Sequence, residues 1–134
     1  MARKISRDPG MARSMLERAS KRLEYIKTQT IDQDNAPFIF EQIYEVIREC
    51  GQSLMAMDGY KPDNSHESVI AFLGDNYGDA FNEKLINDFN RFRIMRNESL
   101  YNSGNISAVA TNKALSIASD FVRITKEQMK SRLH

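Results

Sequence analysis

Cysteine, histidine, glycine and proline are all scarce in this chain of 134 residues. The single cysteine, Cys50, excludes an intramolecular disulfide framework and is typical of a protein from a reducing compartment. The two histidines, His66 and His134, are too few for a zinc site or a His-Glu-x-x-His motif. Six scattered glycines form neither a Walker loop nor a dinucleotide-binding fingerprint. We therefore expect neither a metal nor a cofactor.

Long apolar runs and an excess of one charge are absent as well. No apolar run approaches the ~20 residues that span a bilayer, and the amino terminus is too polar for a secretory signal. We expect a cytoplasmic protein without membrane association. Lysine and arginine total 19 against 18 acidic residues, a net charge of +1. This balance disfavours a uniformly basic nucleic-acid-binding surface, although it can hide local asymmetry.

What the chain does contain is helical periodicity, because apolar residues recur every three or four positions between the glycine and proline breaks. The first amphipathic segment has a basic outer side, and the second begins at Pro37, where a missing N–H costs nothing. The last helix follows Ser107 as its N-cap. The long predicted helices cover about 9–31, 37–57, 79–100 and 108–129.

A short extra helix is predicted between the second and the third long ones. Asn64 or Ser65 serves as its N-cap, and residues 74–78, with two glycines, end or kink it. The elements predict an all-α fold, an antiparallel up-and-down four-helix bundle with one additional short helix. Residues 11–134 form this single domain. Residues 1–10 are a basic arm, and the sequence leaves its order open.

The clearest candidate site lies near the end of the helix predicted over 79–100. Arg93 and Arg96 are three residues apart and share a helix face. Arg96 also continues the line of Phe89 and Phe92, which directs it toward the bundle or an interface, where an unpaired guanidinium is costly. Further donors and acceptors at the same helix end are Asn97, Ser99 and Tyr101.

Two interpretations of Arg96 stay open at this point. In the structural one, Arg96 pairs with Glu45 or Glu49 of a neighbouring helix and holds the bundle together. In the functional one, it belongs to a polar site that binds phosphate or ribose through bidentate hydrogen bonds. Cys50 lies on an apolar stripe and is interpreted as a small buried hydrophobe. His66, at a predicted helix start, is most simply an exposed histidine.

Several segments together resemble the HEPN family of small helical-bundle domains, named for nucleotide binding in higher eukaryotes and prokaryotes. Their order and spacing are similar to those of archaeal-type members, and the resemblance covers most of the chain from Met11 onward. The segments are residues 44–49, 58–61, 65–73 and 93–101. The family implies a bundle of four main helices that often forms a homodimer. Many members are metal-independent ribonucleases of toxin–antitoxin or defence systems, and others partner a nucleotidyltransferase.

One position departs from the pattern of the family's ribonucleases, which have an arginine, a polar residue, three further residues and a histidine. Arg96 and Asn97 match the first two positions, and Tyr101 stands where the histidine is expected. An imidazole with a pKa of about 6.5 exchanges protons near neutral pH, whereas a phenol with a pKa of about 10 does not. The resemblance therefore implies binding more strongly than cleavage.

The sequence thus predicts a HEPN-like module that binds a nucleotide, RNA or a partner without efficient catalysis. An alternative is a metal-independent endoribonuclease, in which Arg96 stabilises phosphate charge and Tyr101 or His66 assists proton transfer. Another is a structural partner subunit of a nucleotidyltransferase. If the basic first and last helices meet, they would form a patch for RNA phosphates or an acidic partner. The predicted ligand-binding residues are Arg93, Arg96, Asn97, Ser99, Tyr101 and His66.

Overall fold

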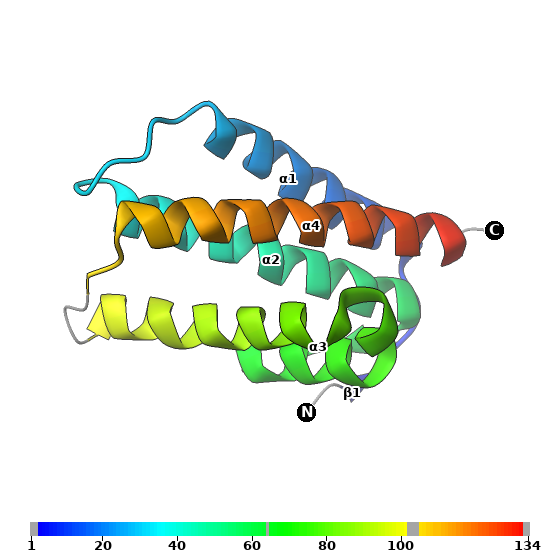
Figure 1. Ribbon diagram of the computed structural model, residues 1–134. Coiled ribbons are helices and arrows are strands. Elements are labelled where there is room, and N and C mark those ends of the chain that lie inside the picture. Colours follow the sequence, from blue (N-terminus) through cyan, green and yellow to red (C-terminus); the bar gives the residue numbers. More distant parts are fainter. Residues whose placement is uncertain (1–2, 64, 102–104, 133–134) are drawn as a thin grey trace.

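The computed structural model describes residues 3–63, 65–101 and 105–132, with side chains for all of these except residues 100 and 101. In these ranges four helices pack together, which confirms the all-α prediction (Figure 1). Two strands of two residues each form a small ribbon at one end. The elements are β1 (Arg3–Lys4), α1 (Pro9–Lys27), α2 (Ala36–Asp58), β2 (Tyr60–Lys61), α3 (His66–Tyr101) and α4 (Ala108–Arg132).

Helix α2 is the centre of the molecule and contacts every other helix. It begins with proline in its first turn, as predicted, and 14 of its 23 residues are buried. Gly59 ends it with a φ of 81°. A Cβ at this position would lie 2.7 Å from the carbonyl oxygen of Ile5, so both the backbone conformation and the close approach require glycine.

The described part of the amino-terminal arm, residues 3–8, runs beside β2 and the end of α2. Arg3 and Lys4 pair antiparallel with Lys61 and Tyr60. The arm continues along the end of α2, where the backbone N–H of Ile5 donates to the carbonyl of Gly59 at 2.7 Å. The first helix then begins at Pro9, two residues before the predicted domain start, and ends at Lys27, four before the predicted Ile31.

The predicted short extra helix is not a separate element, and this prediction is wrong. Residues 74–78, which were predicted to end or kink this helix, lie within α3 and contain a kink, because Tyr77 has non-helical dihedral angles; a second departure lies at Asn82. Space is open around the helical Gly74 and Gly78, so neither glycine has to end the helix. Asn82 has φ 64° and ψ 165°, and its side chain accepts from the backbone N–H of Leu85 at 3.0 Å. Asn82 thus caps the residues that follow it.

Helix α3 doubles back on itself at this kink (Figure 1). Arg93 Nη1 lies 3.4 Å from Oε1 of Glu67, which is 26 positions earlier in the chain. A straight helix, at ~1.5 Å per residue, would hold the two residues about 39 Å apart. We call residues 66–76 the first arm of α3 and residues 83–101 the second arm. Ser65 caps the first arm by accepting from the backbone N–H of Glu67, whereas Asn64 lies outside the described residues.

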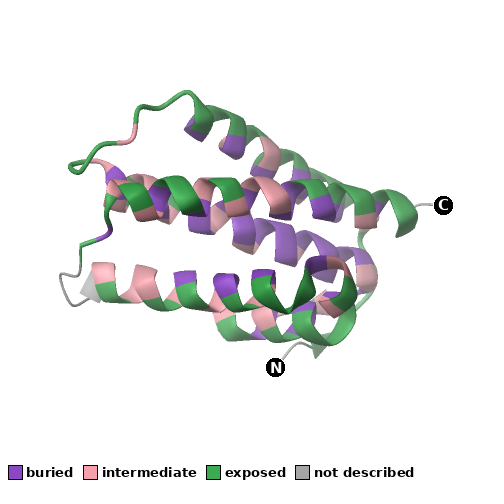
Figure 2. Ribbon diagram, in the orientation of Figure 1, coloured by how far each residue is buried: buried purple, intermediate pink, exposed green. Residues whose placement is uncertain are grey.

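Aromatic contacts join the second arm of α3 to α2 and α4. Phe92 packs on Phe40 with ring centroids 5.5 Å apart, and Phe89 packs on Tyr44 and Phe121, both at 5.8 Å. The inward direction predicted for Phe89 and Phe92 is confirmed, since both are buried. From Phe89 to Phe92 the contacted residue in α2 changes from Tyr44 to Phe40, so residue numbers decrease along α2 while they increase along α3. The second arm therefore runs antiparallel to α2. Figure 2 shows the buried residues on the facing sides of the helices.

Candidate functional site

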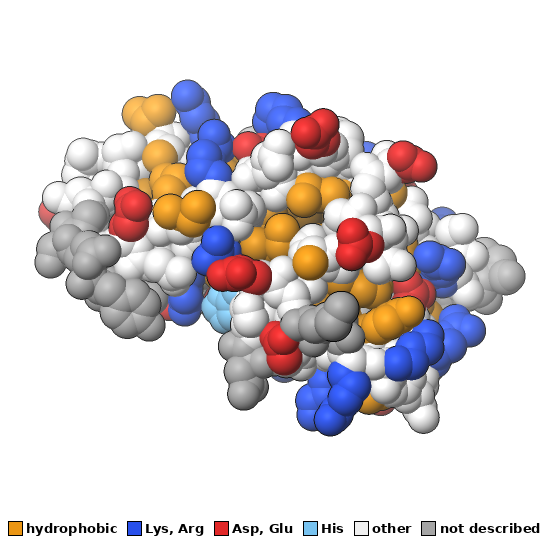
Figure 3. All heavy atoms as spheres, turned by 90° about the horizontal axis from the view of Figure 1, so that it is seen from below, with side chains coloured by type: hydrophobic (Ala, Val, Ile, Leu, Met, Phe, Trp, Pro, Cys, Tyr) orange, Lys and Arg blue, Asp and Glu red, His pale blue; other side chains and the backbone are white. Residues whose placement is uncertain are grey.

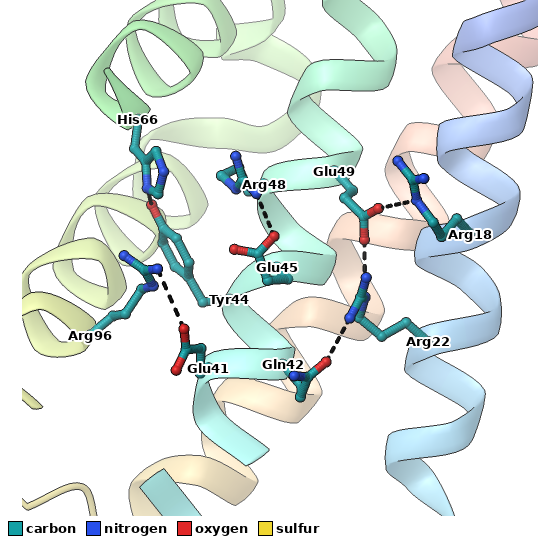
Figure 4. A network of polar contacts seen from close by, with 10 residues as sticks. All are labelled: Arg18, Arg22, Glu41, Gln42, Tyr44, Glu45, Arg48, Glu49, His66 and Arg96. Carbon is teal, nitrogen blue, oxygen red and sulfur yellow. Dashed lines mark hydrogen bonds and ion pairs between the residues drawn. The ribbon is translucent and has the colours of Figure 1, made fainter. Parts of the chain in front are cut away.

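The fold-back of α3 brings His66 and Arg96 to the same tyrosine of α2. The Nδ1 atom of His66 lies 3.0 Å from the hydroxyl of Tyr44. The guanidinium carbon of Arg96 lies 5.5 Å from the centroid of the Tyr44 ring (Figure 4). We call this group the Tyr44 site, and it also includes Arg48 and Arg93, whose charges act on both Tyr44 and His66.

Arg96 does not pair with either of the glutamates that the structural interpretation named. Its Nη2 lies 3.4 Å from Oε1 of Glu41, and its Nη1 lies 3.5 Å from Oδ1 of Asn97. The side chain is only 18% exposed, and its Nε atom is buried with no hydrogen-bond partner among the described residues. Arg96 is therefore half-buried, with two long polar contacts and one buried donor that has no partner among the described residues, an arrangement that is costly without a further acceptor.

The glutamates are engaged elsewhere. Glu49 is buried between α2 and α1, where it accepts from Arg18 at 2.6 Å and from Arg22 at 3.0 Å. Arg22 also donates to Gln42 at 2.6 Å. These contacts join α1 to α2 beside the Tyr44 site (Figure 4). Glu49 therefore joins α2 to the first helix, whereas the structural interpretation paired it with Arg96.

Arg48 and Arg93 complete the positive side of the site. Arg48 pairs with Glu45 one turn earlier in α2, and its Nε atom is buried without a partner among the described residues. Arg93 is held by Oδ1 of Asn90 at 3.0 and 3.1 Å, and its contact with Glu67 is 3.4 Å long. Since the side chain of Glu67 is 71% exposed, water competes strongly for this pair.

The protonation states of Tyr44 and His66 follow from their surroundings. Burial raises the pKa of Tyr44 to about 12, although the charges of Arg96 and Arg48 oppose the shift. Burial lowers the pKa of His66 below its ordinary value, and the charges of Arg48 and Arg96 lower it further. Both side chains are therefore neutral at neutral pH.

The remaining predicted site residues lie in the last turns of α3. Asn97 contacts Arg96, and Ser99 is half-buried beyond it. The side chain of Tyr101 lies outside the described residues. Sequence reasoning missed Tyr44, Glu41 and Arg48, which face α3 from the central helix. The available signal was a set of polar residues recurring every three or four positions on an otherwise apolar helix.

The surface at His66 is accessible. His66 is half-buried, and Figure 3 shows histidine, coloured pale blue, at the surface with basic and acidic side chains beside it. A ligand could therefore reach the imidazole from solvent, although the Tyr44 ring below it is completely buried.

A second charged feature is a groove between α1 and α4, the two helices for which the sequence predicted basic surfaces. The groove has a volume of about 410 Å³. Its basic residues are Lys27, Arg123 and Lys126, and Glu24 and Glu127 line it as well. Arg123 is paired with Glu127 at 3.4 Å. The acidic residues partly offset the positive charge, so this groove is weaker than a purely basic patch as an attractor of phosphates.

The described residues contain no group of three or more histidine, cysteine or acidic side chains that could hold a metal ion. Within the same ranges, no helix is both long and apolar enough to cross a membrane. No protein-family model, curated protein or solved structure matches the chain. The resemblance to the HEPN family stays a prediction.

Proposed function

We propose that this chain is a HEPN-like binding module that takes a phosphate-bearing ligand, a nucleotide or RNA, at the Tyr44 site. The observation that carries the proposal is the convergence of Arg48, Arg93 and Arg96 around His66, with the Nε atoms of Arg48 and Arg96 buried and without a hydrogen-bond partner among the described residues. Guanidinium groups match phosphate oxygens in pairs and keep their charge at any physiological pH.

The acidic residues of the site leave room for such an anion. Glu41 and Glu67 contact Arg96 and Arg93 at 3.4 Å each, which is longer than a strong charged hydrogen bond. A phosphate could replace these contacts with shorter ones. His66 is also the first residue of α3, and the amino-terminal end of a helix carries a partial positive charge that favours anions.

The test is binding of adenosine monophosphate and of a short single-stranded RNA, measured by calorimetry. Replacing Arg96 with alanine should weaken binding at least tenfold. The matched control is Arg91→Ala, since Arg91 lies on the same arm but is exposed and pairs with Asp88. The proposal fails if the parent chain binds neither ligand, or if the two variants lose affinity equally.

A metal-independent ribonuclease is the second candidate, because His66 supplies an imidazole beside Arg96 that the Arg96–Tyr101 motif lacks. Arg96 would stabilise charge on the phosphate, and His66 would have to remove a proton from a ribose hydroxyl. Incubation of RNA with the chain and a chelator tests this function. Cleavage that disappears in both Arg96→Ala and His66→Ala would support it. The predicted homodimer and nucleotidyltransferase partner stay predictions.

A further inference from the structure

The hydroxyl of Tyr44 is a buried donor with one acceptor. Tyr44 is 0% exposed, and among the described residues the only hydrogen-bond partner of its hydroxyl is Nδ1 of His66, at 3.0 Å. A buried hydroxyl that does not donate loses its hydration without compensation. The geometry therefore favours a hydrogen bond in which Tyr44 donates and Nδ1 accepts.

The alternative arrangements are each less favourable. If Nδ1 of His66 carried the proton and donated to Tyr44, the tyrosine proton would be left in the core without an acceptor. If His66 were doubly protonated, its Nδ1 could not accept, and the hydroxyl proton of Tyr44 would again have no acceptor among the described residues. A positive imidazole would also stand among Arg48, Arg93 and Arg96.

We infer that Tyr44 is a positioning residue: it holds His66 in the neutral tautomer with the proton on Nε2, so that His66 donates a hydrogen bond to the ligand. The tautomer rests on contacts within the chain alone, and the role of the Nε2–H group toward a phosphate oxygen rests on the proposed function. Nε2 lies across the ring from Nδ1 and so points away from Tyr44, and it has no hydrogen-bond partner among the described residues.

The charged groups around His66 agree with a neutral ring. Arg48 faces it from α2, and Arg93 and Arg96 face it from the second arm of α3; all of them oppose a positive imidazole. Glu45 acts in the other direction but is occupied by Arg48. Glu41 and Glu67 are paired with Arg96 and Arg93. Burial and the guanidinium charges together lower the pKa of His66.

In this tautomer His66 can donate a hydrogen bond to a bound ligand but cannot act as a general base in cleavage. A general base needs a free lone pair directed at the hydroxyl that it deprotonates. In His66 the lone pair of Nδ1 accepts from Tyr44, and Nε2 carries the proton. The Tyr44 site can therefore hold a phosphate through donors, while its imidazole is withheld from proton abstraction.

The experiment is a long-range proton–nitrogen correlation spectrum of the isotope-labelled 134-residue chain near neutral pH. Such spectra distinguish the two neutral tautomers of an imidazole and its protonated form. His66→Asn assigns the His66 signals against those of His134. The expected result is a protonated Nε2 and an unprotonated, hydrogen-bonded Nδ1. A predominantly Nδ1-protonated or doubly protonated His66 would overturn the inference.

Tyr44→Phe tests the cause, because it removes the hydroxyl and leaves the ring. His66 should then become a mixture of tautomers. The matched control is Tyr77→Phe, since Tyr77 is also buried and its hydroxyl donates to Asp58 at 2.6 Å, with no contact to His66. Thermal unfolding followed by circular dichroism checks that both variants fold. An unchanged tautomer in Tyr44→Phe, or an equal change in Tyr77→Phe, would contradict the inference.

Titration of the parent chain with inorganic phosphate separates this inference from the proposed function. A shift of the Nε2 proton signal on addition of phosphate supports both. If the Nε2 tautomer is present but phosphate shifts no signal at the Tyr44 site, the positioning role of Tyr44 stands and the proposed function fails. If phosphate binds while the proton is on Nδ1, the proposed function stands and the role inferred for Tyr44 is wrong.

Discussion

The side-chain oxygen of Asn82 accepts a hydrogen bond from the backbone N–H of Leu85 at 3.0 Å, at the point where helix α3 reverses direction. Asn82 is also the only described non-glycine residue with a positive φ. The residue therefore combines a conformation that favours glycine with a cap that only a polar side chain provides. The reversal that it supports carries Arg96 back to the start of the same helix, so the candidate site depends on it.

The first prediction concerns this turn. Asn82→Ala should lower the free energy of unfolding by about 1–2 kcal/mol, because the cap is lost while the strained backbone stays. Asn82→Gly should lower it by less, since glycine relieves the strain. Urea unfolding measures both, and Asn87→Ala, at an exposed position in the second arm, is the control. Equal stability of all these variants would show that the cap is unimportant.

The second prediction compares two glycines. Gly59→Ala should destabilise the protein by about 1–3 kcal/mol, because φ is positive and the new Cβ would meet the Ile5 carbonyl. Gly74→Ala should instead stabilise it by up to about 1 kcal/mol, since Gly74 is helical and nothing lies within 4 Å of a Cβ there. Chemical unfolding of the two variants side by side checks the opposite signs. Changes of the same sign would contradict the argument.

The third prediction concerns the buried carboxylate of Glu49. Glu49→Ala should cost about 1–3 kcal/mol of stability, because Arg18 and Arg22 lose their common partner. The cost stays below that of a fully buried pair since Arg18 is 63% exposed and can be hydrated. The control is Glu17→Ala, which removes an exposed pair with Lys21 and should change stability by less than about 0.5 kcal/mol. Similar losses in both would mean that burial of Glu49 has no special weight.

The fourth prediction is a pH dependence of stability that arises from His66. Its pKa is lower in the folded chain than the value of about 6.5 expected for the unfolded chain. Between these two pKa values the unfolded state binds more protons than the folded state. The free energy of unfolding therefore rises with pH in this window, and the contribution of His66 to stability is lost as the pH falls through its pKa in the folded chain. His66→Gln should flatten this rise in urea unfolding measured at a series of pH values, whereas His134→Gln should retain it. A parent chain whose stability falls with rising pH below about 6.5 would contradict the assignment.

Local sequence patterns were enough to predict where α1, α2 and α4 lie in the chain. The three- and four-residue spacing of apolar residues places α1, α2 and α4 within a few residues of their observed bounds. Ser65 and Ser107 act as the N-caps that their positions predicted. These features depend on residues that are neighbours along the chain, so the chain itself carries the information.

The turn of α3 and the partners of the charged groups depend on the packed structure. The predicted break at residues 74–78 contains the kink at Tyr77, but the glycines gave no signal for the second departure from helical geometry, at Asn82. Arg96 has several glutamates within a plausible reach, and Arg18 and Arg22 occupy Glu49 from a helix far away in sequence. The pairing of Tyr44 with His66 arises only when α3 packs on α2, because no local periodicity relates the two residues. The helices follow from short-range spacing, whereas the chemistry of the Tyr44 site follows from which helix faces meet.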